Sequence, residues 1–68
     1  MKWDKYYWRK VKLTDVDNQV FIGIVDDIDD KIDTESGQYE IDLSGTKQFP
    51  DNIVSFREDE IKSIEIIN

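Results

Sequence analysis

The residues with the most obvious chemical potential are the carboxylates that gather near the middle of the 68-residue chain. Residues 26–33 read DDIDDKID, which places carboxylates at Asp26, Asp27, Asp29, Asp30 and Asp33. Several carboxylate oxygens in one place could bind a hard divalent cation. The spacing is not that of a calcium-binding loop, however, and no glycine supplies the sharp turn at its centre. We therefore predict a solvated acidic face that binds a protein, and no metal.

The composition offers little for catalysis. The chain has no histidine and no cysteine, which excludes the usual zinc sites and the common pairs of nucleophile and base. Acid–base work by two carboxylates would require a pocket that separates their pKa values, and a domain of this length has little interior for one. We predict that the protein is not an enzyme and uses no cofactor.

The net charge of −7 is unevenly distributed along the chain. Residues 1–14 carry five basic side chains against one acid, whereas residues 26–42 carry eight acids against Lys31. A strongly acidic surface repels nucleic acid and anionic membranes and attracts a basic protein surface. Neither a secretion signal nor a membrane-spanning apolar stretch is recognisable, which predicts a cytoplasmic protein.

Two further groups of residues could contact a partner. The segment Trp3–Lys10 combines four aromatic rings with basic side chains, which could stack nucleic-acid bases or cover one end of a sheet. Phe49, beside Pro50 in a long loop, could dock on a protein or fold back onto the core. Both alternatives stay open for each group.

The hydrophobic pattern that must position these residues is mainly that of β-strands. The sequence predicts one domain over residues 1–68, with strands at 10–14, 20–25, 39–43, 53–56 and 61–67. Turns are expected at Asp15–Asn18, Thr34–Gly37 and Arg57–Glu60, the last of them compatible with a single 3-10 turn. The first residues could form a short helix capped by Asp4 or extend the first strand.

The second of these strands has an unusual composition. Val20–Val25 is apolar except for Gly23, so we expect both faces of the strand to contact apolar material. A glycine inside such a run marks a bend or a close approach of another backbone. A long second strand that bends can join both halves of a small barrel. The predicted fold is therefore all-β, a strongly bent five-stranded antiparallel sheet that forms a small barrel.

Two segments carry a resemblance to a known family. Val11–Asp33, VKLTDVDNQVFIGIVDDIDDKID, resembles the first signature motif of Sm-like (Lsm) proteins, which have SH3-like barrels. The places of that motif are held by Asn18, Gly23, Val25, Ile28 and Asp29, with Asn for its first glycine and Ile for its aromatic residue. Val54–Ile64, VSFREDEIKSI, is similar to the second motif through Phe56, Arg57, Ile61 and Ile64, with Glu58 in place of its glycine.

The resemblance implies single-stranded RNA binding in a ring of subunits, which pair through their fourth and fifth strands. Asp29 and Arg57 match two residues of the family's RNA pocket. Lys31 stands where a residue would stack a base, and Asp33 stands where an Asn would read the base edge. An Asp lacks the amide donors of Asn, and its charge opposes a nearby phosphate.

Two functions follow as hypotheses. The first is an acidic Sm-like module that docks on a basic protein surface through the four aspartates of residues 26–30 and through Phe49. Some acidic Sm-like proteins inhibit the transcription terminator Rho in this way. The alternative is an RNA-binding ring subunit, a homo-oligomer that uses Asp29, Lys31, Asp33 and Arg57.

Overall fold

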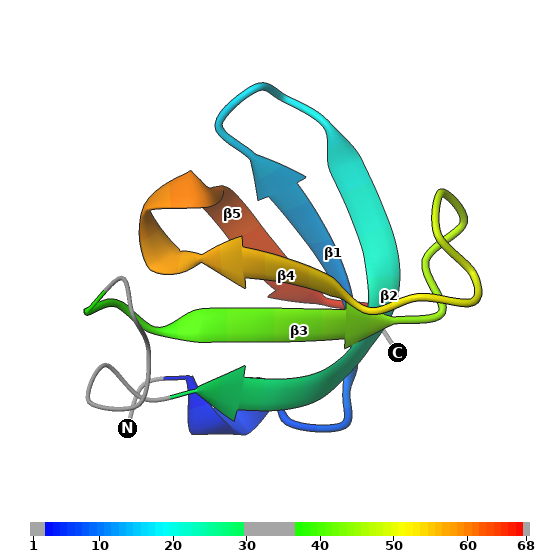
Figure 1. Cartoon of the computed structure of the whole chain (residues 1–68), viewed down its shortest axis with the longest axis horizontal. Helices are drawn as coiled ribbons and strands as arrows, with labels where there is room; N and C mark the ends of the chain where they lie inside the picture. Colours follow the sequence, from blue (N-terminus) through cyan, green and yellow to red (C-terminus); the bar gives the residue numbers. More distant parts are fainter. Residues whose placement is uncertain (1–2, 30–36, 68) are drawn as a thin grey trace.

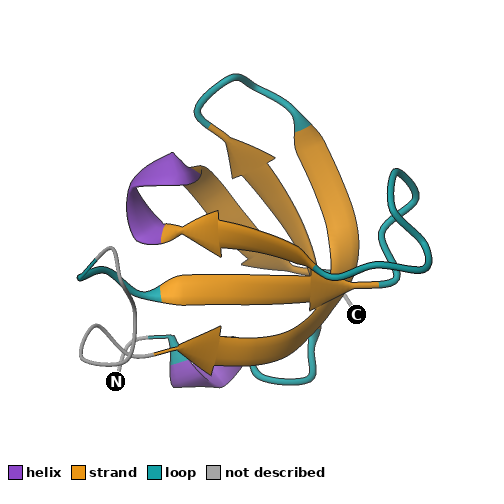
Figure 2. Ribbon diagram, viewed as in Figure 1, coloured by secondary structure: helices purple, strands orange, loops and turns teal. Residues whose placement is uncertain are grey.

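The computed structural model describes residues 3–29 and 37–67 of the chain. In this part five antiparallel strands form one sheet, and two short 3-10 turns accompany it (Figures 1 and 2). The elements are η1 (Asp4–Tyr6), β1 (Lys10–Asp15), β2 (Val20–Asp29), β3 (Glu40–Ser44), β4 (Val54–Arg57), η3 (Glu58–Glu60) and β5 (Ile61–Ile66). The prediction of five strands is confirmed, whereas the expected turn at Thr34–Gly37 lies largely outside the described residues.

The strands form a meander whose last member returns to the first. The order across the sheet is β4-β3-β2-β1-β5, so β4 and β5 are its two edge strands. Within the described ranges no ladder joins these two edges, and the closed barrel therefore stays a prediction. The turn η3 connects β4 to β5, as the polar sequence Arg57–Glu60 predicts.

The core lies on the inner face of the bent sheet. Alternation along β1, β2 and β3 directs every second side chain inward, because successive side chains of a strand point to opposite faces. The buried apolar residues are Trp3, Val11, Leu13, Phe21, Val25, Ile28, Ile41, Leu43 and Phe56. Phe21 of β2 and Phe56 of β4 meet edge to face with their ring centroids 5.0 Å apart. Each fully buried side chain of this size contributes about 1.5–3 kcal/mol.

The second strand differs from its prediction in two ways. It continues past Val25 to Asp29, because pairing with β3 extends to Asp29 opposite Glu40. Its outer face is also open, with Val20, Ile22 and Ile24 exposed by 41, 42 and 36%. The expectation that both faces contact apolar material is therefore wrong, because an antiparallel sheet can leave one face to solvent.

Gly23 marks a close approach, as the sequence predicts. A Cβ atom at this position would lie 2.6 Å from the carbonyl oxygen of Ser44 and 3.0 Å from Cγ2 of Thr46. Two residues further on, the pairing of β2 with β3 shifts register between Val25 and Asp27. Such irregularities bend a strand and increase its twist. This bend separates β2 into two halves, Val20–Val25 and residues 26–29.

The N-terminal aromatic residues mostly cover the core. Trp3 is buried, and Tyr6 and Tyr7 pack against the core cluster. A 3-10 turn is present at Asp4–Tyr6, but its N-cap is Trp3 without a side-chain hydrogen bond, so the predicted cap by Asp4 is wrong. No helix in the described ranges is long and apolar enough to cross a membrane.

The turn between β1 and β2 forms as its residue types predict. Oδ1 of Asp15 accepts hydrogen bonds from the backbone N–H groups of Asp17 (2.9 Å) and Gln19 (2.8 Å). Asn18 adopts the left-handed conformation with φ of 65°. Asp and Asn favour turns because their side chains bond to the nearby backbone and because they tolerate the left-handed conformation. Here Asp15 makes the hydrogen bonds and Asn18 adopts the left-handed conformation.

Candidate functional site: an acidic face

The outer face of β2 and β3 carries four carboxylates in two adjacent rows. Asp27 lies opposite Asp42, and Asp29 lies opposite Glu40. Residues paired directly across two antiparallel strands point to the same face of the sheet. Their neighbours Ile28 and Ile41 point inward to the core. We call Asp27, Asp29, Glu40 and Asp42 the acidic face.

Three of these carboxylates are close enough to interact strongly. Oxygen atoms of Asp27, Asp29 and Asp42 all lie within 4.8 Å of one another. The pKa of Asp29, which is half-buried, is raised above its ordinary value. Loss of hydration is the largest cause, followed by the negative charges of Asp27 and Asp42. Bringing these three carboxylates together therefore costs free energy that a nearby cation would recover.

Neighbouring polar groups hold two of the acidic side chains in place. Oδ1 of Asp27 accepts a hydrogen bond of 2.9 Å from the backbone N–H of Ile28, and the Tyr7 hydroxyl lies 3.4 Å away. That hydroxyl also donates to the carbonyl oxygen of Ile28 at 3.0 Å. On the next strand, the Ser55 hydroxyl donates to Oδ1 of Asp42 at 2.6 Å. These bonds order the carboxylates without neutralising their charge.

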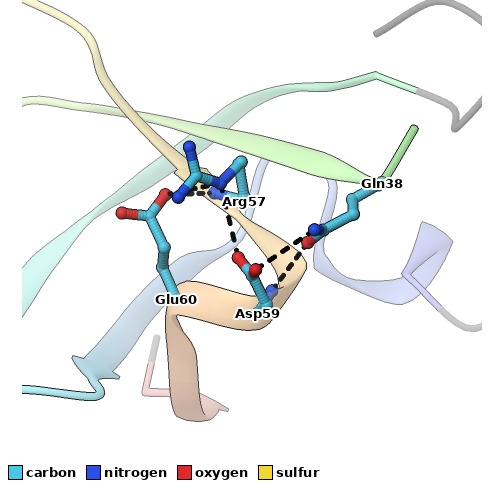
Figure 3. A network of polar contacts seen from close by, with 4 residues as sticks. All are labelled: Gln38, Arg57, Asp59 and Glu60. Carbon is cyan, nitrogen blue, oxygen red and sulfur yellow. Dashed lines mark hydrogen bonds and ion pairs between the residues drawn. The ribbon is translucent and has the colours of Figure 1, made fainter. Parts of the chain in front are cut away.

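One basic residue of the described chain, Arg57, lies next to the acidic face on β4. Arg57 of β4 lies opposite Glu40, but its Nε contacts Oδ1 of Asp59 at 3.4 Å and Oε1 of Glu60 at 3.6 Å (Figure 3). Gln38 donates from its amide to Oδ2 of Asp59 at 3.1 Å. The hydrogen bond from Gln38, and then the bond and charge of Arg57, lower the pKa of Asp59. The Nε of Arg57 is therefore paired with two acids of the turn η3.

Three carboxylates could also hold part of the coordination shell of a hard cation. Calcium takes six to eight oxygen ligands, and Asp27, Asp29 and Asp42 would supply only some of them. Exposed acidic groups commonly gather without an ion. The arrangement is better described as a negatively charged surface than as a metal centre.

The structure brings together only some of the predicted site residues. Asp27 and Asp29 belong to the acidic face, whereas Asp26 is half-buried at the register shift and Asp30 lies outside the described residues. Phe49 is 47% exposed and lies in a different region, beside the first half of β2.

The residues of the expected RNA pocket are only partly described. Asp29 and Arg57 share one row of the outer face, but Glu40 of β3 lies between them. Lys31 and Asp33 lie outside the described residues. Phosphate binding would require available cations in this row. Its described part instead contains two carboxylates and an arginine that already forms ion pairs.

Sequence reasoning did not assign Glu40 and Asp42 to the site. A signal was available, because Ile41 and Leu43 alternate with these two acids and thereby place both on the outer face. The register between β2 and β3, which places Glu40 opposite Asp29 and Asp42 opposite Asp27, could not be predicted from the sequence.

Comparison of the chain with protein-family models, curated proteins and solved structures finds no match. The function must therefore be inferred from the chain's own geometry. An exposed group of carboxylates attracts lysine and arginine side chains of a partner and increases the rate of encounter.

Proposed function

We propose that this chain is a non-enzymatic, Sm-like small barrel whose acidic face binds a basic surface on a partner protein. The observation that carries the proposal is the pairing of Asp27 with Asp42 and of Asp29 with Glu40 on one outer face. A protein surface that otherwise holds nucleic acid has the matching charge, so it is the kind of partner we expect.

The arrangement of the strands supports the barrel. A five-stranded barrel needs a meander in which the last strand returns to the first, and β5 pairs with β1 from Val11 opposite Ile66 to Asp15 opposite Ile61. It also needs a long second strand that bends, and β2 has ten residues with a register shift after Val25. Closure would then require only that the edges β4 and β5 approach each other.

Electrostatics supports the choice of a basic partner. The raised pKa of Asp29 reflects lost hydration and repulsion among carboxylates, and both effects make a docked cation more favourable. Arg57 of β4 contacts Asp59 and Glu60 through its Nε. Interactions of this kind raise the association rate and weaken steeply with salt.

A matched pair of triple variants tests the site. The first is Asp27→Asn, Asp29→Asn and Asp42→Asn, in which each amide oxygen can still accept the hydrogen bonds of the carboxylate. The second, Asp17→Asn, Asp51→Asn and Glu65→Gln, removes the same charge from exposed positions elsewhere. Fluorescence anisotropy with a labelled arginine- and lysine-rich peptide would measure affinity at low and moderate salt. We expect the first variant to bind about tenfold more weakly than the second.

Equal losses in the two variants would mean that only net charge matters, and the proposed site would be wrong. The same assay with labelled uridine-rich RNA tests the alternative function. In that alternative the open edges of β4 and β5 pair between subunits of a ring, which the order of the sheet permits. A monomer in light scattering that does not bind the RNA would exclude it.

A further inference from the structure

A second surface lies on the first half of β2, away from the acidic face. Val20, Ile22 and Ile24 occupy its outer side and are exposed by 41, 42 and 36%. Alternation spaces them about 6.6 Å apart, so they form a straight row. We call these three residues the aliphatic row. Three exposed β-branched side chains in succession make an apolar surface larger than scattered single residues do.

One end of the aliphatic row opens into a pocket. The side-chain amide of Gln48 donates to the carbonyl oxygen of Val20 at 2.8 Å and so fixes the loop between β3 and β4 beside β2. Figure 1 shows this loop projecting next to that strand. An open pocket of about 410 Å³ is lined by Gln19, Val20, Phe21, Gln48 and Phe49. A pocket of this volume is large enough to accept an apolar side chain of a partner.

The other end of the row lies beside a strained, exposed tryptophan. Trp8 is 68% exposed and has a φ of 62°. Its backbone N–H donates to the carbonyl oxygen of Val25 at 2.9 Å, which places the backbone of Trp8 next to the end of the row at Ile24. The left-handed conformation costs such a residue about 1–2 kcal/mol. Strain of this kind concentrates at binding sites.

The charges around the aliphatic row are positive. Across the ladder, Lys10 lies opposite Ile24 and Lys12 lies opposite Ile22. Lys47 precedes Gln48 in the loop on the other side. Glu65 of β5 lies 3.9 Å from Lys12 in an exposed ion pair, which contributes little. In a chain of net charge −7, this surface is a local reversal of sign.

We propose that this surface binds an extended acidic segment of a partner protein. Apolar side chains of the segment would lie along the aliphatic row and enter the pocket at Phe49, and its carboxylates would contact Lys10 and Lys12. An extended segment has the matching spacing, since its side chains repeat on one face every second residue, as those of the aliphatic row do. The inference does not depend on the acidic face, which occupies the other half of the sheet.

Charge and shape favour this occupant over two others. Nucleic acid binds to single-strand sites through stacking on aromatic rings, and the row offers aliphatic side chains along most of its length. A second copy of the chain would also bring a net charge of −7, which opposes self-association. A short acidic segment brings few charges and places them next to lysines.

The test uses two labelled peptides and two protein variants in anisotropy titrations. One peptide alternates Leu with Asp, and the other alternates Leu with Lys. The variant Val20→Thr, Ile22→Thr and Ile24→Thr keeps β-branched residues at strand positions and removes only the apolar surface. The control variant, Val16→Thr, Ile53→Thr and Ile67→Thr, makes the same three substitutions at exposed positions outside the row. We expect the Leu–Asp peptide to bind wild type and the control alike, and to bind the threonine variant about tenfold more weakly.

Absence of binding by the Leu–Asp peptide at low salt would overturn the proposal, as would equal binding by wild type and the threonine variant. Sedimentation that shows a wild-type dimer and a monomeric threonine variant would also overturn it, because a second copy would then cover the row. Binding of labelled uridine-rich RNA that the threonine substitutions abolish would assign the surface to nucleic acid instead. Failure of the arginine- and lysine-rich peptide to bind would contradict only the proposal for the acidic face.

Discussion

The two halves of β2 present opposite chemistry on one outer face. Before the register shift at Val25 the outward residues are Val20, Ile22 and Ile24, with lysines across the ladder on β1. After the shift the outward residues are Asp27 and Asp29, with acids across the ladder on β3. The inward residues of both halves are apolar and buried. The core therefore requires the same pattern throughout, while the outer face is free to differ.

This contrast shows which part of the strand is constrained by folding. Inward positions must be apolar because the thin core of a 68-residue chain depends on each of them. Outward positions contribute little to the core, so an aliphatic row there is not explained by stability. Exposed apolar residues that gather in this way are typical of surfaces that bind a partner.

The strongest test of the contrast compares two isoleucines. Ile41 of β3 is fully buried on the inner face, whereas Ile22 of β2 is 42% exposed on the outer face. We expect Ile41→Ala to destabilise the fold by about 2–5 kcal/mol, because it removes packing and leaves a cavity. Ile22→Ala should cost about 1 kcal/mol or less, mostly through strand propensity. Urea unfolding followed by tryptophan fluorescence measures both.

Similar losses in the two alanine variants would contradict the structure. They would indicate that the aliphatic row is covered within the fold and is not available to a partner. Because the two substitutions delete the same atoms, their difference reports burial and not residue type.

A second test addresses Gly23, which lies in the aliphatic half of β2 and allows β3 to approach. Gly23→Ala should destabilise the fold by about 1–3 kcal/mol, because its Cβ would meet the carbonyl oxygen of Ser44 at 2.6 Å. Adding Thr46→Ser removes Cγ2, the next nearest atom, while retaining the hydroxyl that accepts from the N–H of Phe49. We expect this double variant to recover little stability, because the closer atom belongs to the backbone.

Thermal unfolding of the single and double variants gives the comparison directly. Full recovery in the double variant would show that Thr46, and not the backbone of β3, requires the glycine. A stable Gly23→Ala variant would mean that the two strands can separate without cost.

Much of the fold could be predicted from local pattern. Alternation in Lys10–Thr14 and in Tyr39–Leu43 identified two strands and their inward faces, and Asp15 with Asn18 identified the turn. These features depend on residues close in sequence. The end of β2 was missed because its pairing partner, β3, extends the strand beyond the apolar run.

The candidate surfaces could be predicted only in part. The acids of residues 26–29 were evident from composition, but their grouping with Glu40 and Asp42 depends on the register between two strands. The aliphatic row was interpreted as core, since apolar residues on both faces of a strand usually indicate burial on both faces. Whether a second layer covers a sheet is a property of the whole fold, so it cannot be predicted from a run such as Val20–Val25 alone.

The smallest expected effect contrasts two carboxylates, Asp29 on the acidic face and Asp59 in η3. The pKa of Asp29 is raised, so the folded state binds more protons than the unfolded chain between 3.8 and the raised value. Stability should therefore fall as pH rises through this interval, and the Asp29 charge remains unfavourable at neutral pH. Asp29→Asn should be more stable than wild type at neutral pH, by roughly 0.5 kcal/mol, with the difference vanishing in acid.

Asp59→Asn is the control of opposite sign. The pKa of Asp59 is lowered by Gln38 and Arg57, so its contribution is present above 3.8 and is lost as pH falls through the folded pKa. The Asp59→Asn variant should therefore be less stable than wild type at neutral pH and equal to it in strong acid. Urea titrations of both variants across the acidic range measure the two slopes. A neutral-pH gain in both variants would point to relief of general repulsion in a chain of net charge −7, because only a local effect of the acidic face predicts opposite signs.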